Sequence, residues 1–362
     1  MKISQEPSSS AGWLKTAVVI PVLNERLGLV ELIETLRRQI SPGDEIIFAD
    51  AGSTDGGAEI IREAVAKDPR VRLISSPGAF PGGGRNAAVR NTDAAIIAQV
   101  DGRNMPNDIW LDEIRRPIIR GEADYVTGNT LIFPQMKKFF GVELDLNALY
   151  GAGLFREHPL RGPCLDEAKN LKSHEPAGGD SVAYKREVWE KAGGFPDWLR
   201  AGEDPIFVRK VKQQQPRFAF AEKAVVFWQI GPRFSNIWRR HVNNQKVFFR
   251  TPEALRARVP NILLNLLIPL AAIISMPFPR LWPVSAALPA ALSLRQGLKT
   301  LRVFKLRANP DPSRLAVAVA LLFLLEPAFV LARVWGTFVG FNQLVRQGFT
   351  PFKQRVEKYL SS

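Results

Sequence analysis

Residues 44–56 read DEIIFADAGSTDG, and they decide the fold class of this chain. The apolar run in this stretch predicts a short strand that is buried on both faces and ends at Asp50. Small residues follow, and a helix capped by Ser53 or Thr54 is expected to run to about Lys67. A buried strand that leads directly into a helix is typical of α/β proteins.

The same alternation continues on both sides of this stretch. Further strands are expected at residues 16–21, 71–75 and 94–101, and further helices at 25–38 and 84–91. Strands that are almost continuously apolar and separated by single helices predict a parallel sheet with helices on both faces. We therefore expect one α/β domain over residues 15–250, after a flexible tail at 1–14.

Three polar side chains stand at the predicted carboxyl ends of strands. They are Asn24, Asp50 and Asp101. Because ligands of open α/β sheets bind beyond the carboxyl ends of the strands, this edge of the sheet is the expected binding site.

The last third of the sequence has a different character. Residues 260–278 carry no charge over a length close to the roughly 20 residues that span a bilayer. We expect a membrane-associated helical region over 251–345, with candidate spans at 260–278, 281–294 and 315–341, followed by a basic tail at 346–362. Buried helices of a soluble protein remain the alternative for the two shorter runs.

The charges beside these runs indicate an orientation. Residues 295–314 hold six basic residues and one acidic residue, which favours the cytoplasmic face of a membrane. A helical hairpin over 260–294 fits this placement, because both of its ends return to the cytoplasm. For 315–341, a full span, a re-entrant segment and an interfacial helix all remain open.

Composition excludes several classes of protein. The 362 residues carry a net charge of +14, and from Arg250 onward there are 15 basic and 4 acidic residues. This basicity lies beside apolar runs, so it indicates an anionic membrane surface rather than a nucleic acid. The single cysteine, Cys164, excludes an intramolecular disulfide and any CxxC motif. We see no cleaved signal peptide, so we expect the body of the chain in the cytoplasm.

A glycine-rich stretch, PGGGRNA at 81–87, allows two interpretations. The spacing Gly82-x-Gly84-x-x-Ala87 matches the dinucleotide-binding fingerprint, which favours an NAD(P)-dependent oxidoreductase. That fingerprint belongs to the first strand-to-helix turn, however, and this turn is the third. The competing interpretation places Arg85 and Asn86 beside the phosphates or ribose of a nucleotide.

Three acidic residues also carry more than one interpretation. Asp101 could ligate a divalent cation or simply cap a turn. Glu203 and Asp204 stand at the start of a predicted helix at 204–214, where acids often only complement the helix dipole. Functionally, a carboxylate there could serve as the general base for an acceptor hydroxyl.

Taken together, these motifs form an ordered set. They are VVIPVLNE (18–25), ADAGSTDG (49–56), GGGRNAAV (82–89), the strand end at Asp101, AGGDSVAYKREVWEKAGGF (177–195) and GEDPIF (202–207). The set resembles the family 2 glycosyltransferases of the GT-A fold, and most of all the succinoglycan-type, ExoA-like membrane-associated subgroup. The resemblance covers about residues 16 to 250.

The resemblance implies an inverting transfer of a sugar from a nucleotide-diphosphate donor, in the first place a UDP-sugar. The acceptor is then a lipid-linked saccharide or polysaccharide precursor at the cytoplasmic face of the inner membrane. Pro21, Asn24 and Glu25 fall on the family's first nucleotide-contacting loop, and Asp50 falls on the acid that contacts the base.

The remaining site residues are carried over from the same resemblance. Arg85 and Asn86 match the family's Arg-Asn pair near the donor. Asp101 matches the first acid of the metal-binding D-x-D motif. Asp204 matches the catalytic base, and Glu203 stands beside it in an acceptor-side or supporting role.

One departure from the family pattern matters for the metal. Arg103 stands where the second acid of D-x-D is expected, which puts a bound Mg²⁺ or Mn²⁺ in doubt. Arg103 could itself offset the charge of the donor diphosphate. A polyprenyl-phosphate sugar synthase and a catalytically degenerate membrane-anchored scaffold therefore remain alternatives, beside the oxidoreductase.

Overall fold

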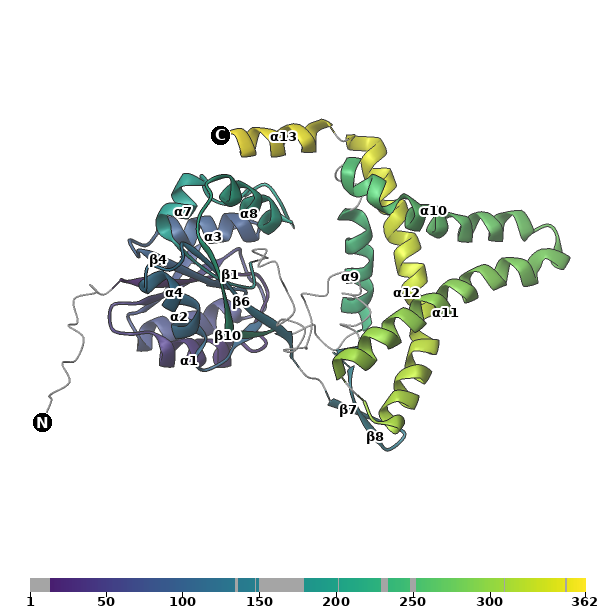
Figure 1. The fold of residues 1–362 in the computed structure, drawn as a ribbon, viewed down its shortest axis with the longest axis horizontal. Coiled ribbons are helices and arrows are strands. Elements are labelled where there is room, and N and C mark those ends of the chain that lie inside the picture. The colour runs from purple at the N-terminus through teal and green to yellow at the C-terminus, as the bar shows by residue number, and fades with distance from the viewer. Residues whose placement is uncertain are drawn as a thin grey trace, which may run out of the picture. The chain divides into compact units, whose positions relative to one another are not determined.

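The computed structural model divides into two compact units. It describes residues 14–133, 136–146, 148–149, 179–200, 202–228, 234–247, 252–308, 310–348 and 350–362. The sheet unit comprises residues 1–130 and 171–228, and the helical unit comprises residues 131–170 and 229–362 (Figure 1). The expected tail at 1–14 lies almost wholly outside the described residues.

An eight-stranded sheet forms the centre of the sheet unit, in the order β3-β2-β1-β4-β9-β6-β10-β5. Its first four strands are parallel, whereas β9 runs antiparallel to both β4 and β6. The expected parallel sheet is therefore confirmed for the first half of the unit, and the second half is mixed. The strands are β1 (Thr16–Val22), β2 (Glu45–Asp50), β3 (Val71–Ser75), β4 (Ile96–Val100), β5 (Asn104–Pro106), β6 (Tyr125–Ile132), β9 (Ser181–Lys185) and β10 (Phe218–Trp228).

Helices cover both faces of this sheet, as the sequence predicts. Side chains alternate between the faces along a strand, so Val18 and Ile20 pack in one core while Ala17 and Val19 pack in the other. The first core includes α1 (Leu29–Gln39), α2 (Gly57–Lys67) and α4 (Trp110–Ile119), and the second includes α3 (Pro81–Arg90), α7 (Arg186–Lys191) and α8 (Glu203–Gln213).

The start of α2 differs from the prediction. The cap is Gly56, whose φ of 84° lies in the left-handed region that favours glycine. The expected caps, Ser53 and Thr54, hydrogen-bond instead to Asp50 and Asn24. The helix therefore starts later, and the residues before it form a loop at the strand ends.

The helical unit is built around the long helix α12. It contains β7 (Met136–Phe139), β8 (Val142–Asp145), α9 (Phe234–Val247), α10 (Pro252–Ser275), the 3₁₀ turn η1 (Pro279–Leu281), α11 (Trp282–Ala308), α12 (Pro312–Gln347) and α13 (Thr350–Ser361). Helix α12 packs against α9, α10, α11 and β8. Among the described residues, 131–133, 136–146, 148–149 and 234–247 are grouped with the helical unit.

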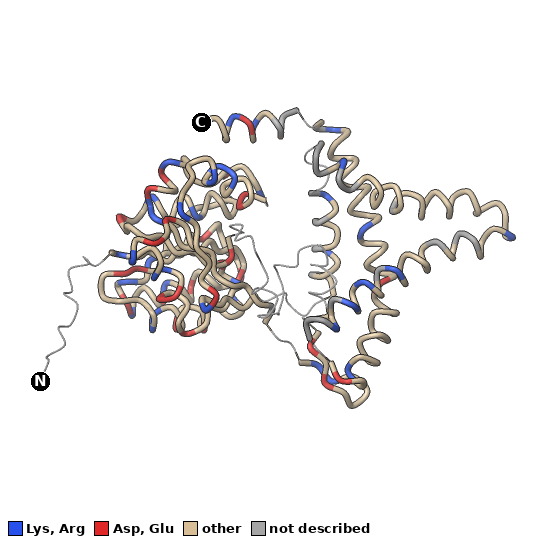
Figure 2. The backbone as a smooth tube through the Cα atoms, viewed as in Figure 1, with Lys and Arg blue, Asp and Glu red and all other residues tan. Residues whose placement is uncertain are grey.

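The three candidate spans map onto three helices. Residues 260–278 lie in α10 and the turn after it, 281–294 comprise the last residue of η1 and the first half of α11, and 315–341 lie within α12. Within the described part of the chain, Pro312–Arg346 is the one helix both long and apolar enough to cross a membrane. Figure 2 shows that charged residues are frequent over the sheet unit and sparse along α10.

Candidate active site

The loops that follow β1 and β2 are joined by hydrogen bonds. The backbone N–H of Thr54 donates to Asn24 Oδ1 at 2.8 Å, and the backbone N–H of Asn24 donates to Ser53 Oγ at 2.9 Å. Ser53 Oγ in turn donates to Asp50 Oδ1 at 2.6 Å. Asn24 adopts φ of 55°, a left-handed conformation that asparagine tolerates. The structure therefore brings two of the expected nucleotide-contacting residues, Asn24 and Asp50, to one edge of the sheet.

The glycine-rich stretch is part of helix α3 and has a packing explanation. A Cβ atom added at Gly84 would lie 3.2 Å from Pro21 Cβ, and one at Gly82 would lie 2.9 Å from the Pro196 carbonyl oxygen. These glycines allow α3 to approach β1 and the segment before α8 closely. Close packing therefore accounts for the glycine spacing that matches the dinucleotide-binding fingerprint. It also brings Pro21 of β1 against Gly84 of α3.

Asn86 is buried and holds a neighbouring turn. Its Nδ2 donates to the Phe195 carbonyl oxygen at 2.8 Å. Its Oδ1 accepts from the backbone N–H of Phe195 at 2.8 Å and from Trp189 Nε1 at 3.0 Å. Through its amide oxygen and nitrogen, Asn86 therefore holds the segment that leads into α8, and its expected position beside the donor stays a prediction.

Arg85 is the centre of a buried ion-pair cluster. Its side chain is 1% exposed. Nη1 donates to Glu203 Oε1 at 2.8 Å and to Asp204 Oδ1 at 3.0 Å, and Nη2 donates to Asp101 Oδ1 at 2.7 Å. One guanidinium from α3 therefore links the end of β4 to the start of α8, and the three predicted acids lie in one site.

Burial and charge act in opposite directions on this cluster. Burial would lower the pKa of Arg85, but Coulombic attraction to Asp204, Asp101 and Glu203 raises it well above its ordinary value. Burial raises the pKa of Asp101 to about 6, and the charge of Arg85 opposes that rise. Arg85 therefore stays charged, and its charge compensates the acids around it.

Glu25 and Arg103 form a second pair at the same edge. Arg103 Nε donates to Glu25 Oε1 at 2.9 Å. Burial raises the pKa of Glu25 to about 7, and the charge of Arg103 counteracts part of this rise. Gly102 makes the arrangement possible, because a Cβ at that position would overlap the Glu25 carboxylate.

Sequence reasoning missed one residue of the cluster. A Cβ at Gly179 would lie 2.5 Å from Asp204 Oδ1 and 2.6 Å from Arg85 Nη2, so the cluster requires glycine there. The Gly179 carbonyl oxygen also accepts from Gln99 Nε2 at 3.2 Å. The only sign of this in the sequence is the pair of glycines before Asp180, and that pair does not indicate which residues Gly179 contacts.

The residues at the D-x-D position fit a divalent cation only in part. No group of three or more His, Cys, Asp or Glu side chains suited to a metal ion occurs among the described residues. Asp101 Oδ1 accepts from Arg85, which leaves Oδ2 as the oxygen that could face a cation. Since Mg²⁺ at phosphate sites often takes one or two carboxylates plus substrate phosphates, Asp101 suffices only together with a bound diphosphate.

Part of the chain is similar to known proteins. Residues 17–177 match the family model of glycosyl transferase family 2. Glycosyltransferase GlyA of Streptococcus pneumoniae is 22% identical over 62% of this chain and 32% of its own length. Succinoglycan biosynthesis protein ExoA of Rhizobium meliloti is 32% identical over 30% of this chain and 34% of its own length. The chain thus spans about a third of each relative.

A solved structure was also similar. The mannosyltransferase PcManGT from Pyrobaculum calidifontis, in complex with GDP-Man and Mn²⁺, gives a TM-score of 0.49 at 17% identity, over 92% of this chain and 91% of that one. The family match over residues 17–177 and the curated relatives support a family 2 glycosyltransferase.

Proposed function

We propose that the sheet unit transfers a sugar from a nucleotide-diphosphate donor, in the first place a UDP-sugar, with inversion at the anomeric carbon. The observation that carries the proposal is the cluster in which Arg85 joins Asp101, Glu203 and Asp204. In this cluster Asp101, the proposed donor-side acid, and Asp204, the proposed base, accept hydrogen bonds from the two terminal nitrogens of one buried guanidinium. Such an arrangement suits an in-line displacement.

In this mechanism Asp204 is the general base. Its carboxylate takes the proton of an acceptor hydroxyl, whose oxygen attacks the anomeric carbon from the face opposite the leaving group. The new glycosidic bond forms as the bond to the diphosphate oxygen breaks, and the nucleoside diphosphate leaves. Arg85 holds Asp204 at 3.0 Å, and the half-buried start of α8 limits its rotation.

The donor side is formed by Asp50, Asp101 and Arg103. Asp50 faces the base, and its loop is fixed by Ser53 and Asn24. Arg103, 53% exposed at its side chain, offsets the charge that develops on the diphosphate. A divalent cation, held by Asp101 and the donor phosphates, would add to this charge compensation.

The acceptor in this proposal is a lipid-linked saccharide or polysaccharide precursor at the cytoplasmic face of the inner membrane. The apolar helix α12 and the exposed cations of α11 support a position at a membrane. The test is transfer of labelled sugar by the full chain in detergent. Label that partitions into an organic phase supports a lipid-linked acceptor, and label that stays with water-soluble products argues against it.

The donor class is tested by thermal unfolding of the solubilised full chain. We expect UDP or GDP to raise the melting temperature, with a larger rise in the presence of Mn²⁺, because a ligand that binds only the folded state stabilises it. NAD serves as the competing ligand, and a rise with NAD alone would overturn the proposal.

A matched pair of variants assigns the effect to the site. Asp50→Asn should reduce the stabilisation by the nucleotide. Asp108→Asn should not, because the Asp108 side chain is 85% exposed and forms a 3.5 Å ion pair with the exposed Arg38. Equal loss in both variants would show that the response does not come from the strand ends.

A further inference from the structure

Two polar side chains of β6 carry buried atoms that have no hydrogen-bond partner. Neither Thr127 Oγ1 nor Asn129 Nδ2 has one among the described residues, and Asn129 is only 8% exposed. A buried hydroxyl or amide without a partner costs free energy, because water satisfied that group in the unfolded chain. Native structures contain few such groups, so these two point to a partner from outside the chain.

Both side chains lie on the face of the sheet that α3 and α8 cover. Side chains alternate along β6, with Val126 packed in the first core and Tyr125 in the second. On the first face, a Cβ atom added at Gly128 would lie 2.9 Å from a side-chain atom of α4. Thr127 and Asn129 therefore share the second face with Tyr125. The second core on this face includes side chains of α3 and α8, the two helices that carry the ion-pair cluster.

The register of the sheet places Asn129 in line with the ion-pair cluster. The pairing of β4 with β9 ends at Val100 opposite Ser181, and its continuation by one residue places Asp101 opposite Asp180. The pairing of β6 with β9, continued in the same way, places Asn129 opposite Asp180 from the other side. Since neighbouring strands lie about 4.8 Å apart, the backbones of Asp101 and Asn129 are about 10 Å apart across β9.

The order of the strands matches the order of the groups in a nucleotide-sugar. From β2 the sheet continues through β1, β4 and β9 to β6. In the proposed function, Asp50 of β2 faces the base and Asp101, directly after β4, faces the diphosphate. The sugar follows the diphosphate in the donor, and β9 and β6 follow β4 in the sheet. A sugar hydroxyl both donates and accepts a hydrogen bond, so it complements the Thr127 hydroxyl and the Asn129 amide N–H.

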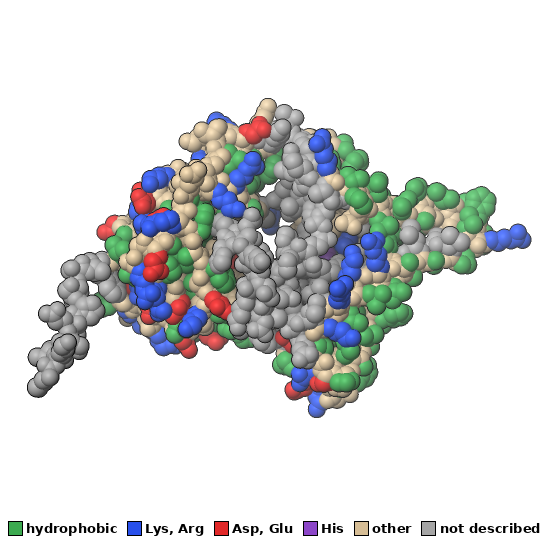
Figure 3. All heavy atoms as spheres, in the orientation of Figure 1, with side chains coloured by type: hydrophobic (Ala, Val, Ile, Leu, Met, Phe, Trp, Pro, Cys, Tyr) green, Lys and Arg blue, Asp and Glu red, His purple; other side chains and the backbone are tan. Residues whose placement is uncertain are grey.

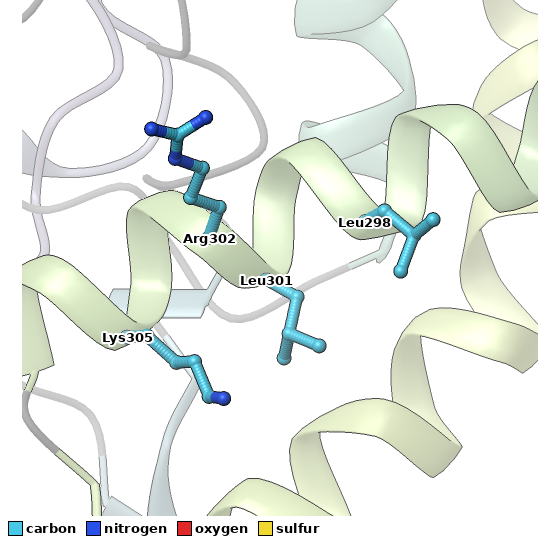
Figure 4. A pocket seen from close by; sticks show the side chains of 4 residues that line it. All are labelled: Leu298, Leu301, Arg302 and Lys305. Atoms are coloured by element: carbon cyan, nitrogen blue, oxygen red, sulfur yellow. The ribbon is translucent and has the colours of Figure 1, made fainter.

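A pocket on α11, in the helical unit, differs from this pair of side chains. It has a volume of ≈ 370 Å³ and is lined by Leu298, Leu301, Arg302 and Lys305. Arg302 and Lys305 are exposed, and Figure 3 shows Lys and Arg side chains on the visible surface of this unit. In Figure 4, Leu298, Leu301 and Lys305 point to one side of α11 and Arg302 points to the other. Because water hydrates exposed cations, neither cation requires a ligand as the two β6 side chains do.

We infer that Thr127 and Asn129 bind hydroxyl groups of the transferred sugar and help to select it. The inference rests on the proposed function, because it takes the position of the diphosphate from there. A site built to hydrogen-bond a hydroxyl rejects a sugar that lacks this hydroxyl or turns it away, since the buried protein group is then left unpaired. The two side chains of β6 thus determine specificity and take no part in the displacement itself.

Calorimetric titration of the full chain in detergent tests the inference. The ligands are UDP, GDP, UDP-glucose, UDP-galactose, UDP-GlcNAc and GDP-Man, each with Mn²⁺. Thr127→Val and Asn129→Leu keep the approximate shape of the side chain and remove its polar group. Each variant should bind the nucleotide-sugar that the natural protein binds best roughly 2- to 10-fold more weakly, because one neutral hydrogen bond is lost, and bind the parent diphosphate as before. An equal change for both ligands, or none, would overturn the inference.

Stability without ligand provides a second readout, which does not depend on nucleotide binding. Thr127→Val should keep or raise the melting temperature, because it removes a buried hydroxyl that no described residue pairs with. Thr92→Val is the matched control and should lower it by about 3 °C or more, because the Thr92 hydroxyl donates to Glu45 and accepts from the Ala94 N–H at 3.0 Å.

The two readouts separate the inference from the proposed function. A fall in melting temperature for Thr127→Val as large as that for Thr92→Val would show that the hydroxyl has a partner in the folded chain or a fixed water, and it would overturn the inference. If the natural protein bound none of the six nucleotides, the titration would count against the proposed function, and the melting temperatures would still decide whether the Thr127 hydroxyl lacks a partner.

Discussion

Arg103 Nε lies 2.9 Å from Glu25 Oε1 and donates a hydrogen bond to it. The side chain of Arg103 is 53% exposed and that of Glu25 is 14% exposed. The cation is therefore accessible at the edge of the sheet, whereas the carboxylate is mostly buried. Glu25 Oε2 is buried and has no hydrogen-bond partner among the described residues. The family's usual second acid is thus replaced by a cation two residues from Asp101.

This pair predicts how nucleotide binding depends on metal. We expect UDP or GDP still to bind the natural protein in EDTA, since one charged hydrogen bond from Arg103 contributes about 1.5–3 kcal/mol, or roughly 10- to 150-fold in affinity. Arg103→Asp should bind the nucleotide only in Mn²⁺, because it restores two acids and removes the cation. Calorimetric titration measures both, and Arg103→Asp binding equally well in EDTA would contradict the assigned role.

Arg85 predicts a large effect on stability. Arg85→Gln leaves Asp101, Glu203 and Asp204 near one another without their cation, and breaking a buried ion pair in this way costs about 3–5 kcal/mol. Arg90→Gln on the same helix is the control, because Arg90 is exposed and should cost below about 1 kcal/mol. Urea unfolding of both variants makes the comparison. Similar costs would mean that the cluster does not stabilise the fold.

Asp68 predicts a pH dependence of stability. Hydrogen bonds from Arg70, and with them one from Arg37, hold the pKa of this buried carboxyl well below its ordinary range. A lowered pKa in the folded state stabilises the protein above the unfolded-state pKa of about 3.9, and that contribution is lost as the pH falls further. Asp68→Asn should therefore be less stable at pH 7, with the difference shrinking below about pH 4.

The comparison for Asp68 uses melting temperatures at pH 7, 5 and 3. Asp108→Asn is the matched control, because its carboxylate is exposed and should change stability little at any of these values. A stability difference for Asp68→Asn that stays constant down to pH 3 would show that the substitution acts through packing rather than through ionisation.

We expect substitution of Gly179 to lower the transfer rate with little effect on donor binding. Gly179→Ala would place a methyl group 2.5 Å from Asp204 Oδ1, and a displacement of about 1 Å at a reacting group can cost on the order of 100-fold in rate. Gly83→Ala is the control, since its nearest neighbours would be 3.5 Å away. Steady-state transfer rates test this, and equal rates for both variants would remove Gly179 from the site.

Much of the sheet unit could be predicted from the sequence. The strands that end at Asp50 and near Asp101 are short, apolar and separated by single helices, so period and composition locate them. The cap of α2 could not be predicted, because Ser53 and Thr54 have better partners in Asp50 and in Asn24, which is about 30 residues away in the sequence. The residues next to Ser53 and Thr54 in the sequence do not show that Asp50 and Asn24 take these hydrogen bonds.

Most residues of the candidate site could be named from the sequence, but the hydrogen bonds that join them could not. The acids at 101, 203 and 204 each had an ordinary local explanation, and nothing near them in the sequence indicates that they share Arg85. The hydrogen bonds of Arg85 join residues that are between 16 and 119 positions apart in the sequence. They therefore form only once β4, α3 and α8 are packed together. The mixed second half of the sheet was missed for a related reason, since β9 pairs with β4 across a long insertion.

The central claim is that Asp204 is the base of an inverting sugar transfer, and one pair of measurements on Asp204→Asn tests it most directly. The account predicts that this variant retains thermal stabilisation by UDP or GDP but loses transfer by roughly 100-fold or more, because a positioned base contributes about 10²–10⁴-fold. Transfer at close to the natural rate, with nucleotide binding intact, would contradict it.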